Sequence, residues 1–480
     1  MPRTLLSFAL AAAVFAPAAL AADGADLTVY RSDSAALFAA GADGAVNDGY
    51  AVVHEQRHLQ LTAGTHDMVI GNLPDYLDPE AVALSFGSNA QVLSQRLLLP
   101  HGQNGTLTGH IGKQVTVLGA GGQPLAQGTL ARVGADGSLI IGGDVYGPTV
   151  VRDYAAVKLT GGEVGGGARL QLRVDAPNGG ATDAVLTYPT SGIGWRAAYT
   201  ATLKPGNSCR MQLKSQASIA NRSGRDWHDA DIKLVAGEPN FAKPAPQPMM
   251  MRAAAAPKAE SYAATQGTLG DYRSYALPGA VDLPAGSVTL TPLYAARSVD
   301  CTRTWLFENG NNWTPPQPMT ADTGSSQSSG PVASTLAFRA FDSLPAGYLR
   351  VLTMDADGNA EFLGEGRVAD TPKGQDVDFT MGNAFDLRGS RERTAFNVDQ
   401  AARQMDEAFR VTLSNAGDSA RTVTVREHPS RWRNWTLTSS SAKPSAQTTD
   451  TLEFRVNVPA NGSATLDYAV QYTWTADDEP

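Results

Sequence analysis

Residues 54–58 read His-Glu-Gln-Arg-His, and this H-E-x-x-H pattern is typical of zinc-dependent hydrolases. On a helix, His54 and His58 share one face and hold a single zinc ion, while Glu55 acts as the general base. The segment 50–61, however, lies between two glycines and has the pattern of a strand. Residues four apart on a strand are separated by about 13 Å, whereas both ligand nitrogens must lie within about 2.1 Å of one zinc ion. We therefore predict a strand here, and a zinc-dependent hydrolase that uses these residues is the alternative.

A second candidate for chemistry is the run Asp355-Ala-Asp357-Gly358-Asn359-Ala-Glu361, which places oxygen-bearing side chains at alternate positions. A calcium loop of this kind requires Gly at its sixth position and Glu at its twelfth. Here Gly is fourth, and the twelfth residue is Gly366. An Asp-Gly hairpin turn between two strands explains the run, and calcium binding is the alternative.

Tryptophans gather in the second half of the chain, where Trp432 and Trp435 flank Arg433 and Asn434. Exposed, these rings offer flat surfaces on which sugar rings stack, as aromatic anchors do in polar interfaces. Buried, they belong to the core of a β-sandwich. Arg391 lies in a charged run and indicates either a solvated loop or a contact to an acidic ligand. Trp432, Trp435 and Arg391 are therefore our candidate ligand contacts.

Other catalytic patterns are missing from the sequence. There is no Gly-x-Ser-x-Gly nucleophile elbow, and no glycine-rich loop ends in Lys-Ser or Lys-Thr. We predict no catalytic residue and no cofactor. The formal net charge of −9 argues against nucleic acid or an anionic membrane as the main partner.

The two cysteines, Cys209 and Cys301, are predicted to form a disulfide, because an even pair in an exported chain usually bonds. Two buried thiols, or a metal or redox site, are the alternatives. The wide spacing lacks the C-x-x-C pattern that metal and redox sites commonly show.

The first 22 residues have the features of a signal peptide. Arg3 precedes an apolar run over 5–15, and Ala19-Leu20-Ala21 fits the small-x-small cleavage rule. The run is shorter than the roughly 20 residues needed to span a bilayer, and no later stretch is long enough. We expect an exported protein, periplasmic or secreted, with no transmembrane segment.

Short apolar-polar alternations separated by Gly, Pro, Asn and Asp predict an all-β protein with less than about 10% helix. Only 398–409 has the pattern of a short helix. A Pro, Met and Ala-rich run and closely spaced short strands mark the boundaries between units. The predicted organisation is a signal peptide (1–22), an N-terminal β domain (23–103), a small SH3-like or similar β-barrel (104–165), the first part of a C-terminal β region (166–240), a low-complexity insertion (241–272) and the remainder of a C-terminal β-sandwich region (273–480).

Several blocks carry a resemblance to a known family. They include Tyr188-Pro-Thr-Ser-Gly-Ile-Gly-Trp, Asn221-Arg-Ser-Gly-Arg-Asp-Trp and Gly382-Asn-Ala-Phe-Asp. Together they resemble the bacterial family of unknown function that includes the mucoidy-inhibitor A-like proteins, over about 185–475. The resemblance implies a β fold and no established catalytic residue. It assigns a structural role to Gly194, Trp195, Tyr199, Asn221, Gly224, Asp226, Trp227, Gly237, Phe385 and Asp386.

The sequence thus predicts an exported, non-enzymatic β protein of the bacterial envelope that acts as an interaction or structural module. Its expected partner is an unidentified envelope protein or polysaccharide. The alternatives are a glycan-binding or cell-wall-binding protein that uses exposed tryptophans, and the zinc-dependent hydrolase.

Overall fold

The computed structural model describes residues 24–40, 46–98, 107, 110–134, 136–142, 147–159, 168–204, 209–237, 264–310, 312–322, 327–355 and 357–478. Strands make up 66% and helices 2%, which confirms the all-β prediction. The helical elements are α1 (Ala35–Phe38) and the 3-10 turn η1 (Ala476–Asp478). Within the described ranges, no helix combines the length and apolar character needed to cross a bilayer. The predicted signal peptide and residues 241–263 of the predicted insertion lie outside these ranges.

An eight-stranded sheet joins segments that are distant in sequence. Strand β1 pairs in parallel with β15 and antiparallel with β2, so the first strand of the described chain lies inside a sheet completed by residues beyond 225. The strands are β1 (Ala25–Tyr30), β2 (Ala51–Leu61), β4 (Ala83–Phe86), β12 (Gly180–Thr190), β15 (Trp227–Ala236), β16 (Thr265–Leu269), β17 (Tyr272–Ala276) and β18 (Val281–Leu283).

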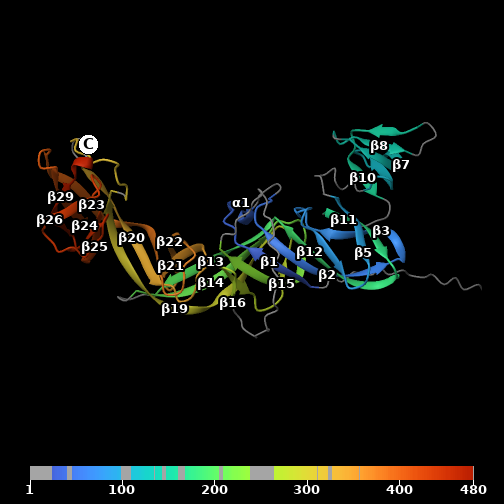
Figure 1. Cartoon of the computed structure of the whole chain (residues 1–480), viewed down its shortest axis with the longest axis horizontal. Coiled ribbons are helices and arrows are strands. Elements are labelled where there is room, and N and C mark those ends of the chain that lie inside the picture. Colours follow the sequence, from blue (N-terminus) through green and yellow to red (C-terminus); the bar gives the residue numbers. More distant parts are fainter. Residues whose placement is uncertain are drawn as a thin grey trace, which may run out of the picture.

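Two smaller sheets lie at the end of the molecule remote from the C-terminus (Figure 1). One contains β3 (Gly64–Leu73), β5 (Gln91–Leu98) and β11 (Ala168–Ala176). The other has its own hydrophobic core and contains β6 (Gln114–Leu118), β7 (Pro124–Val133), β8 (Leu139–Gly142), β9 (Thr149–Val151) and β10 (Ala156–Leu159). In the described part of the chain, these five strands form an open path, β10-β6-β7-β8-β9, and no pairing closes them into a barrel.

The remaining strands form one extended sheet of thirteen strands. They are β13 (Ile193–Leu203), β14 (Arg210–Asn221), β19 (Ser287–Asn309), β20 (Ser328–Arg339), β21 (Gly347–Met354), β22 (Ala360–Val368), β23 (Asp376–Asp399), β24 (Gln404–Asn415), β25 (Arg421–Glu427), β26 (Trp435–Ser440), β27 (Ala446–Gln447), β28 (Leu452–Val458) and β29 (Gly462–Thr473). The prediction of a helix over 398–409 is wrong, because β23 and β24 form a hairpin there.

Long strands connect two separate hydrophobic cores in this elongated molecule (Figure 1). The first half of β19 pairs with β14, and its second half pairs with β20 and β25. Likewise β23 pairs first with β20 and then with β24. Because the same strands contribute to both cores, backbone hydrogen bonds continue from the middle of the molecule to its C-terminal end.

The same asparagine corner occurs once beside each core. Asn221 ends β14, and its Nδ2 donates to the carbonyls of Arg225 (2.8 Å) and Leu283 (2.7 Å). Asn415 ends β24, and its Nδ2 donates to the carbonyls of Ser419 (2.9 Å) and Pro459 (3.0 Å). In both corners the side-chain oxygen accepts the backbone N–H two residues later. Each asparagine thus ties its turn to a distant hairpin, which explains why Asn is required there.

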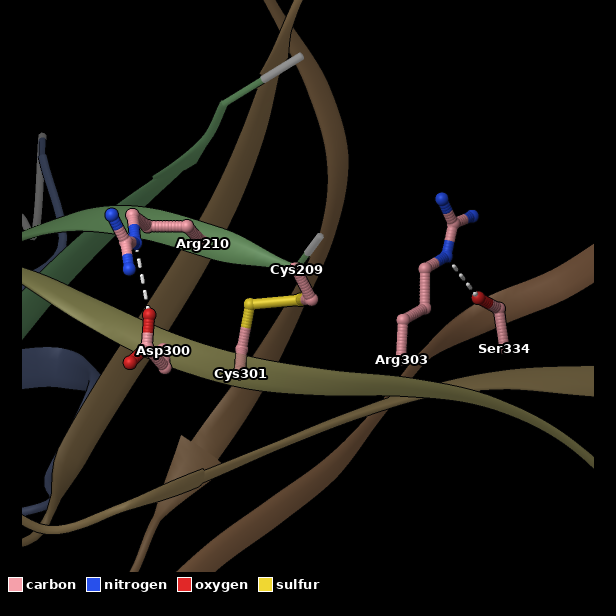
Figure 2. Close-up of a disulfide and its surroundings, with 6 residues drawn as sticks. All are labelled: Cys209, Arg210, Asp300, Cys301, Arg303 and Ser334. Atoms are coloured by element: carbon pink, nitrogen blue, oxygen red, sulfur yellow. Dashed lines mark hydrogen bonds and ion pairs between the residues drawn. A yellow bond between two sulfur atoms is a disulfide. The ribbon is translucent and has the colours of Figure 1, made fainter. Parts of the chain in front are cut away.

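The predicted disulfide between Cys209 and Cys301 is confirmed. It lies where β19 leaves β14 and begins to pair with β20 (Figure 2). The Cys301 N–H donates to the Cys209 carbonyl at 3.0 Å, and Arg210 Nε donates to Asp300 Oδ1 at 2.9 Å. The covalent bond therefore fastens β14 to β19 at the junction of the two cores.

Candidate functional sites

The H-E-x-x-H segment belongs to β2, so the prediction of a strand at 50–61 is confirmed. His54 Nδ1 lies 2.9 Å from Thr187 Oγ1, and His58 Nδ1 is bonded to Asp183. Glu55 lies on the opposite face of the strand and is buried. The structure therefore does not bring the three residues to one point. No group of three or more His, Cys, Asp or Glu residues in the described ranges is arranged to hold a metal ion.

Glu55 instead forms the centre of a buried charged cluster. Its carboxylate accepts bonds from Arg225 at 2.8 and 3.2 Å, from Arg57 Nη2 at 2.9 Å and from the Tyr188 hydroxyl at 2.9 Å. The Arg225 guanidinium also lies 4.1 Å from the centre of the Trp227 ring. The cluster joins β2, β12 and the turn before β15. Sequence reasoning missed it because Glu55 and Arg225 are 170 positions apart.

The electrostatics of this cluster favour a paired carboxylate. Burial alone would raise the pKa of Glu55, but hydrogen bonds and the charge of Arg225, together with Arg57, hold this pKa below its usual value. Arg225 and Arg57 both donate to Glu55, although the Nε atom of each arginine is buried without a hydrogen-bond partner among the described residues. We conclude that the cluster ties strands together, which is a structural role.

Arg391 also has an internal partner. Its Nε donates to Glu427 Oε2 at 2.8 Å, and the Tyr468 hydroxyl donates to the same oxygen at 2.7 Å. Asn309 Nδ2 donates to the other oxygen at 3.0 Å. Burial raises the pKa of Glu427, although Arg391 opposes this shift. The Arg391 guanidinium therefore pairs with a buried carboxylate of its own chain rather than with an acidic ligand.

Trp432 and Trp435 have different environments. Trp432 is buried, whereas Trp435 is half-buried and donates from Nε1 to the Thr449 carbonyl at 2.7 Å. The most exposed large aromatic ring nearby is Trp313, whose exposed fraction is 53%. Trp313 and Trp432 line a cavity of about 180 Å³ together with Asn312, Arg433 and Asp450. A clustering of tryptophans was visible in the sequence, but the contribution of Trp313 was not.

A wider and shallower hollow of about 440 Å³ lies along β20, β23 and β24. Its lining includes Gly330, Pro331, Gly389 and Ser414, with Arg388 as the charged group. The Arg388 guanidinium donates from Nη1 to three backbone carbonyls of its own strand, between 2.9 and 3.1 Å. Small side chains and a committed arginine make this hollow a poor candidate for a specific site.

The run around Asp355 forms a turn. Asp355 Oδ1 accepts the backbone N–H groups of Asp357 (2.9 Å) and Asn359 (2.7 Å), and Gly358 has a φ of +85°. These bonds hold the carboxylate against its own backbone, as in an Asx turn. The arrangement agrees with a hairpin turn between β21 and β22.

The aromatic residues of the family-like blocks lie in the first core. Trp195, Tyr199 and Trp227 are buried. Trp195 Nε1 donates to the Val235 carbonyl at 2.9 Å, and the Tyr199 hydroxyl donates to the Pro345 carbonyl at 2.7 Å. These bonds satisfy the polar ends of large buried rings.

The other residues of these blocks shape turns and close contacts. A Cβ at Gly194 would lie 2.7 Å from Leu37 Cδ2, and Gly224 and Gly237 have φ values of +80° and +119°. Asp226 Oδ1 accepts the Ala285 N–H at 2.7 Å. The carbonyl of Asp386 accepts the Ala416 N–H at 2.9 Å, whereas Phe385 is 90% exposed.

A comparison with curated protein sequences finds no significant match. A family model described as a domain of unknown function, DUF4139, matches residues 184–476, which is more than half of the chain. The matched range runs from within β12 to the end of β29 and includes the disulfide, the second core and part of the first core, whose other residues lie before residue 184. The chain therefore belongs to the DUF4139 family.

Proposed function

We propose that this chain is an exported, non-enzymatic protein of the bacterial envelope, related to the mucoidy-inhibitor A-like proteins. It would serve as a rigid interaction or structural module. The observation that carries the proposal is the pair of long strands, β19 and β23, which join two cores and are fastened by the Cys209–Cys301 disulfide. An elongated body of this kind is suited to holding partners at a defined separation.

The disulfide supports the exported location. Disulfides persist in oxidising compartments, such as the bacterial periplasm, and are rare in the reducing cytosol. The N-terminal features of a signal peptide point in the same direction. The two observations are independent, because one concerns the first 22 residues and the other a bond in the middle of the chain.

The buried charges support a structural role. Glu55 and Glu427, the carboxylates that would be the most distinctive catalytic candidates, each hold arginine and tyrosine partners across strands. Buried hydrogen-bond networks that span several strands favour one arrangement of those strands. Rigidity, which an interaction module needs, is therefore built into the interior.

The proposal is tested by expressing the full chain and a variant without residues 1–22 in a bacterium, followed by fractionation. Intact mass after thiol alkylation should show a periplasmic or secreted chain that begins at Ala22 or Asp23 and has no free thiol. The shortened variant should remain in the cytoplasm. A full-length chain found in the cytoplasm with two alkylated cysteines would contradict export.

The interaction role is tested by crosslinking in the native envelope. A photoreactive amino acid at exposed position 385, and at exposed position 350 as a second site, should capture reproducible neighbours from the envelope. The same positions in purified protein provide the background. If neither position yields a neighbour above that background, the module does not act by stable contact through these surfaces.

A further inference from the structure

The cavity beside Trp313 and Trp432 has walls supplied by three segments. Asn312, Trp313 and Thr314 come from the segment after β19, Trp432 from the segment before β26, and Thr449 and Asp450 from the turn before β28. Its volume of about 180 Å³ is that of roughly six water molecules. This is much less than the space that drug-sized ligands occupy, and it suits one small ring.

Buried bonds fix the first two walls against each other. Arg431 Nη1 donates to the carbonyls of Met319 (2.7 Å) and Ala321 (3.0 Å), and the Met319 N–H donates to the Arg431 carbonyl at 3.0 Å. Arg431 is itself held by Glu407 at 2.6 Å. The segment that carries Trp313 is thus attached to the residue next to Trp432 by three hydrogen bonds.

The third wall is fixed in the same way. Trp435 Nε1 donates to the Thr449 carbonyl at 2.7 Å, and His428 Nδ1 lies 3.1 Å from the Asp450 carbonyl. His428 also contacts Glu308 through Nε2 at 2.9 Å. Because all three walls are anchored, the cavity is preformed, and a ligand need not order it on binding.

The accessible aromatic surface of the lining indicates a ligand. Trp313 exposes about half of a large aromatic side chain at the cavity, where it provides a flat apolar surface. Trp432 is only 1% exposed, and within the described residues its Nε1 atom has no hydrogen-bond partner. Trp432 is therefore a buried wall of the cavity, and Trp313 supplies the accessible aromatic surface.

We propose that this cavity binds a single pyranose unit of a glycan. A sugar ring has apolar C–H faces that stack on an indole and hydroxyl groups around its edge. Here Trp313 is accompanied in the lining by the polar residues Asn312, Thr449 and Asp450. A small apolar surface with a few polar groups around it is the usual composition of a specific ligand site. The neighbouring units of the glycan would continue along the protein surface.

The experiment is saturation-transfer NMR and calorimetry on the purified full chain. The probes are the methyl pyranosides of glucose, galactose, mannose and N-acetylglucosamine, with trimers of any sugar that binds. At least one sugar should bind, with the transfer strongest on its C–H protons. Absence of binding across the whole panel at millimolar concentration would overturn the proposal.

Variants locate the site. Trp313→Ala should weaken binding at least tenfold, whereas Phe385→Ala, which removes another exposed ring far along the chain, should leave it unchanged. Trp432→Phe changes a buried wall of the cavity and should weaken binding less than Trp313→Ala does. Circular dichroism checks that each variant is folded. Sugar binding that survives Trp313→Ala in a folded protein would contradict this location.

A peptide with the proline-containing sequence of residues 243–250 serves as the competing occupant, because aromatic cavities also bind proline-rich segments. If the peptide binds and no sugar does, the cavity is a site for a proline-containing segment and the sugar proposal is wrong. The inference does not depend on the envelope role, since binding is measured in vitro. Failure of sugar binding leaves the fractionation result unaffected, and failure of export leaves the binding result unaffected.

Discussion

Glu55 is buried on β2 and accepts hydrogen bonds from Arg57, Arg225 and Tyr188, so one carboxylate joins three segments of the chain. Its two neighbouring histidines are on the other face of the strand and contact β12. The direction of each side chain follows from the alternation of a strand. The alternation of side chains on β2 therefore keeps Glu55 and the two histidines on opposite faces, and the H-E-x-x-H pattern does not form a metal site.

Replacing Glu55 with Gln leaves Arg225 charged, buried and without a full counter-charge. We expect the free energy of unfolding to fall by about 3–5 kcal/mol, because removing one partner of a buried pair is strongly destabilising. Urea denaturation at pH 7 measures the change. Glu365→Gln, which breaks the exposed pair with Arg350, is the control and should cost less than about 1 kcal/mol. Equal effects of the two substitutions would contradict the structural role of Glu55.

The same residue predicts how stability depends on pH. Because Arg225 and Arg57 depress the pKa of folded Glu55 below its usual value, the contribution of the charged carboxylate to stability is fully present above the pKa that Glu55 has in the unfolded chain. This contribution is lost as the pH falls through the folded pKa. Unfolding free energies measured between pH 7 and pH 3 should therefore fall more steeply in the wild-type chain than in Glu55→Gln. If the unfolding free energies of the two proteins fall in parallel with pH, the pKa of Glu55 is not depressed in the folded chain.

At the scale of elements, each core has an asparagine corner that ties the end of one strand to a hairpin on another. Asn221 reaches the carbonyl of Leu283, and Asn415 reaches that of Pro459. The sequences at these two hairpins are also alike, with Pro-Ala-Gly-Ser at 284–287 and Pro-Ala-Asn-Gly-Ser at 459–463. The shared pattern indicates that the two cores use the same arrangement of an asparagine side chain and a hairpin.

Asn415→Ala removes three donated bonds and one accepted bond at the second corner. Leaving buried backbone groups unpaired should lower the free energy of unfolding by about 1–3 kcal/mol. Chemical denaturation followed by tryptophan fluorescence reports the change, since the second core contains Trp432 and Trp474. Asn457→Ala, at an exposed position of β28, serves as the comparison and should be nearly neutral. A neutral result for Asn415→Ala would show that the corner is not required.

The disulfide is a second link between elements, with 92 positions separating its cysteines. The double substitution of Cys209 and Cys301 by Ala should cost about 2–5 kcal/mol, because the unfolded chain gains freedom when a long loop is opened. Thermal unfolding under identical conditions measures the loss. Limited proteolysis should also detect earlier cleavage near the start of β14. Unchanged melting and proteolysis would show that the β14–β19 pairing needs no covalent support.

At the scale of the whole molecule, the cores differ in how they are connected. The first and second cores share β19, β20 and β23, whereas the five-stranded sheet of β6 to β10 has a core of its own. This sheet follows β5 and precedes β11, and β5 and β11 pair with each other from Leu98 and Arg169 onward. The two ends of the intervening segment are therefore adjacent in space, as expected for an inserted unit.

Replacing residues 99–167 by a short Gly-Ser hairpin loop should leave the rest of the chain folded. Differential scanning calorimetry should show that the main transition is retained within a few degrees. Any transition of the five-stranded unit should disappear, because its core is not shared. Collapse of the main transition would show that the inserted unit is needed for the stability of the remainder.

The sequence alone determined the class of local structure. Alternating apolar residues and turn signals predicted strands, and they correctly placed the H-E-x-x-H run on one of them. The cysteine pair predicted the disulfide. Strand patterns depend on neighbouring residues, and the disulfide prediction depends on the number of cysteines, so both can be predicted from the sequence alone. The helix expected over 398–409 failed because a hairpin between two long strands overrode a weak local pattern.

The tertiary structure alone decided which residues meet. Glu55 and Arg225 lie 170 positions apart, and Trp313 and Trp432, which are also distant in sequence, line one cavity. The register between strands sets such contacts, and register depends on the packing of both faces of every sheet at once. For the same reason, the sequence did not show that β19 and β23 contribute to both cores. A local pattern specifies that a residue is extended, but only the assembled sheets specify its neighbour.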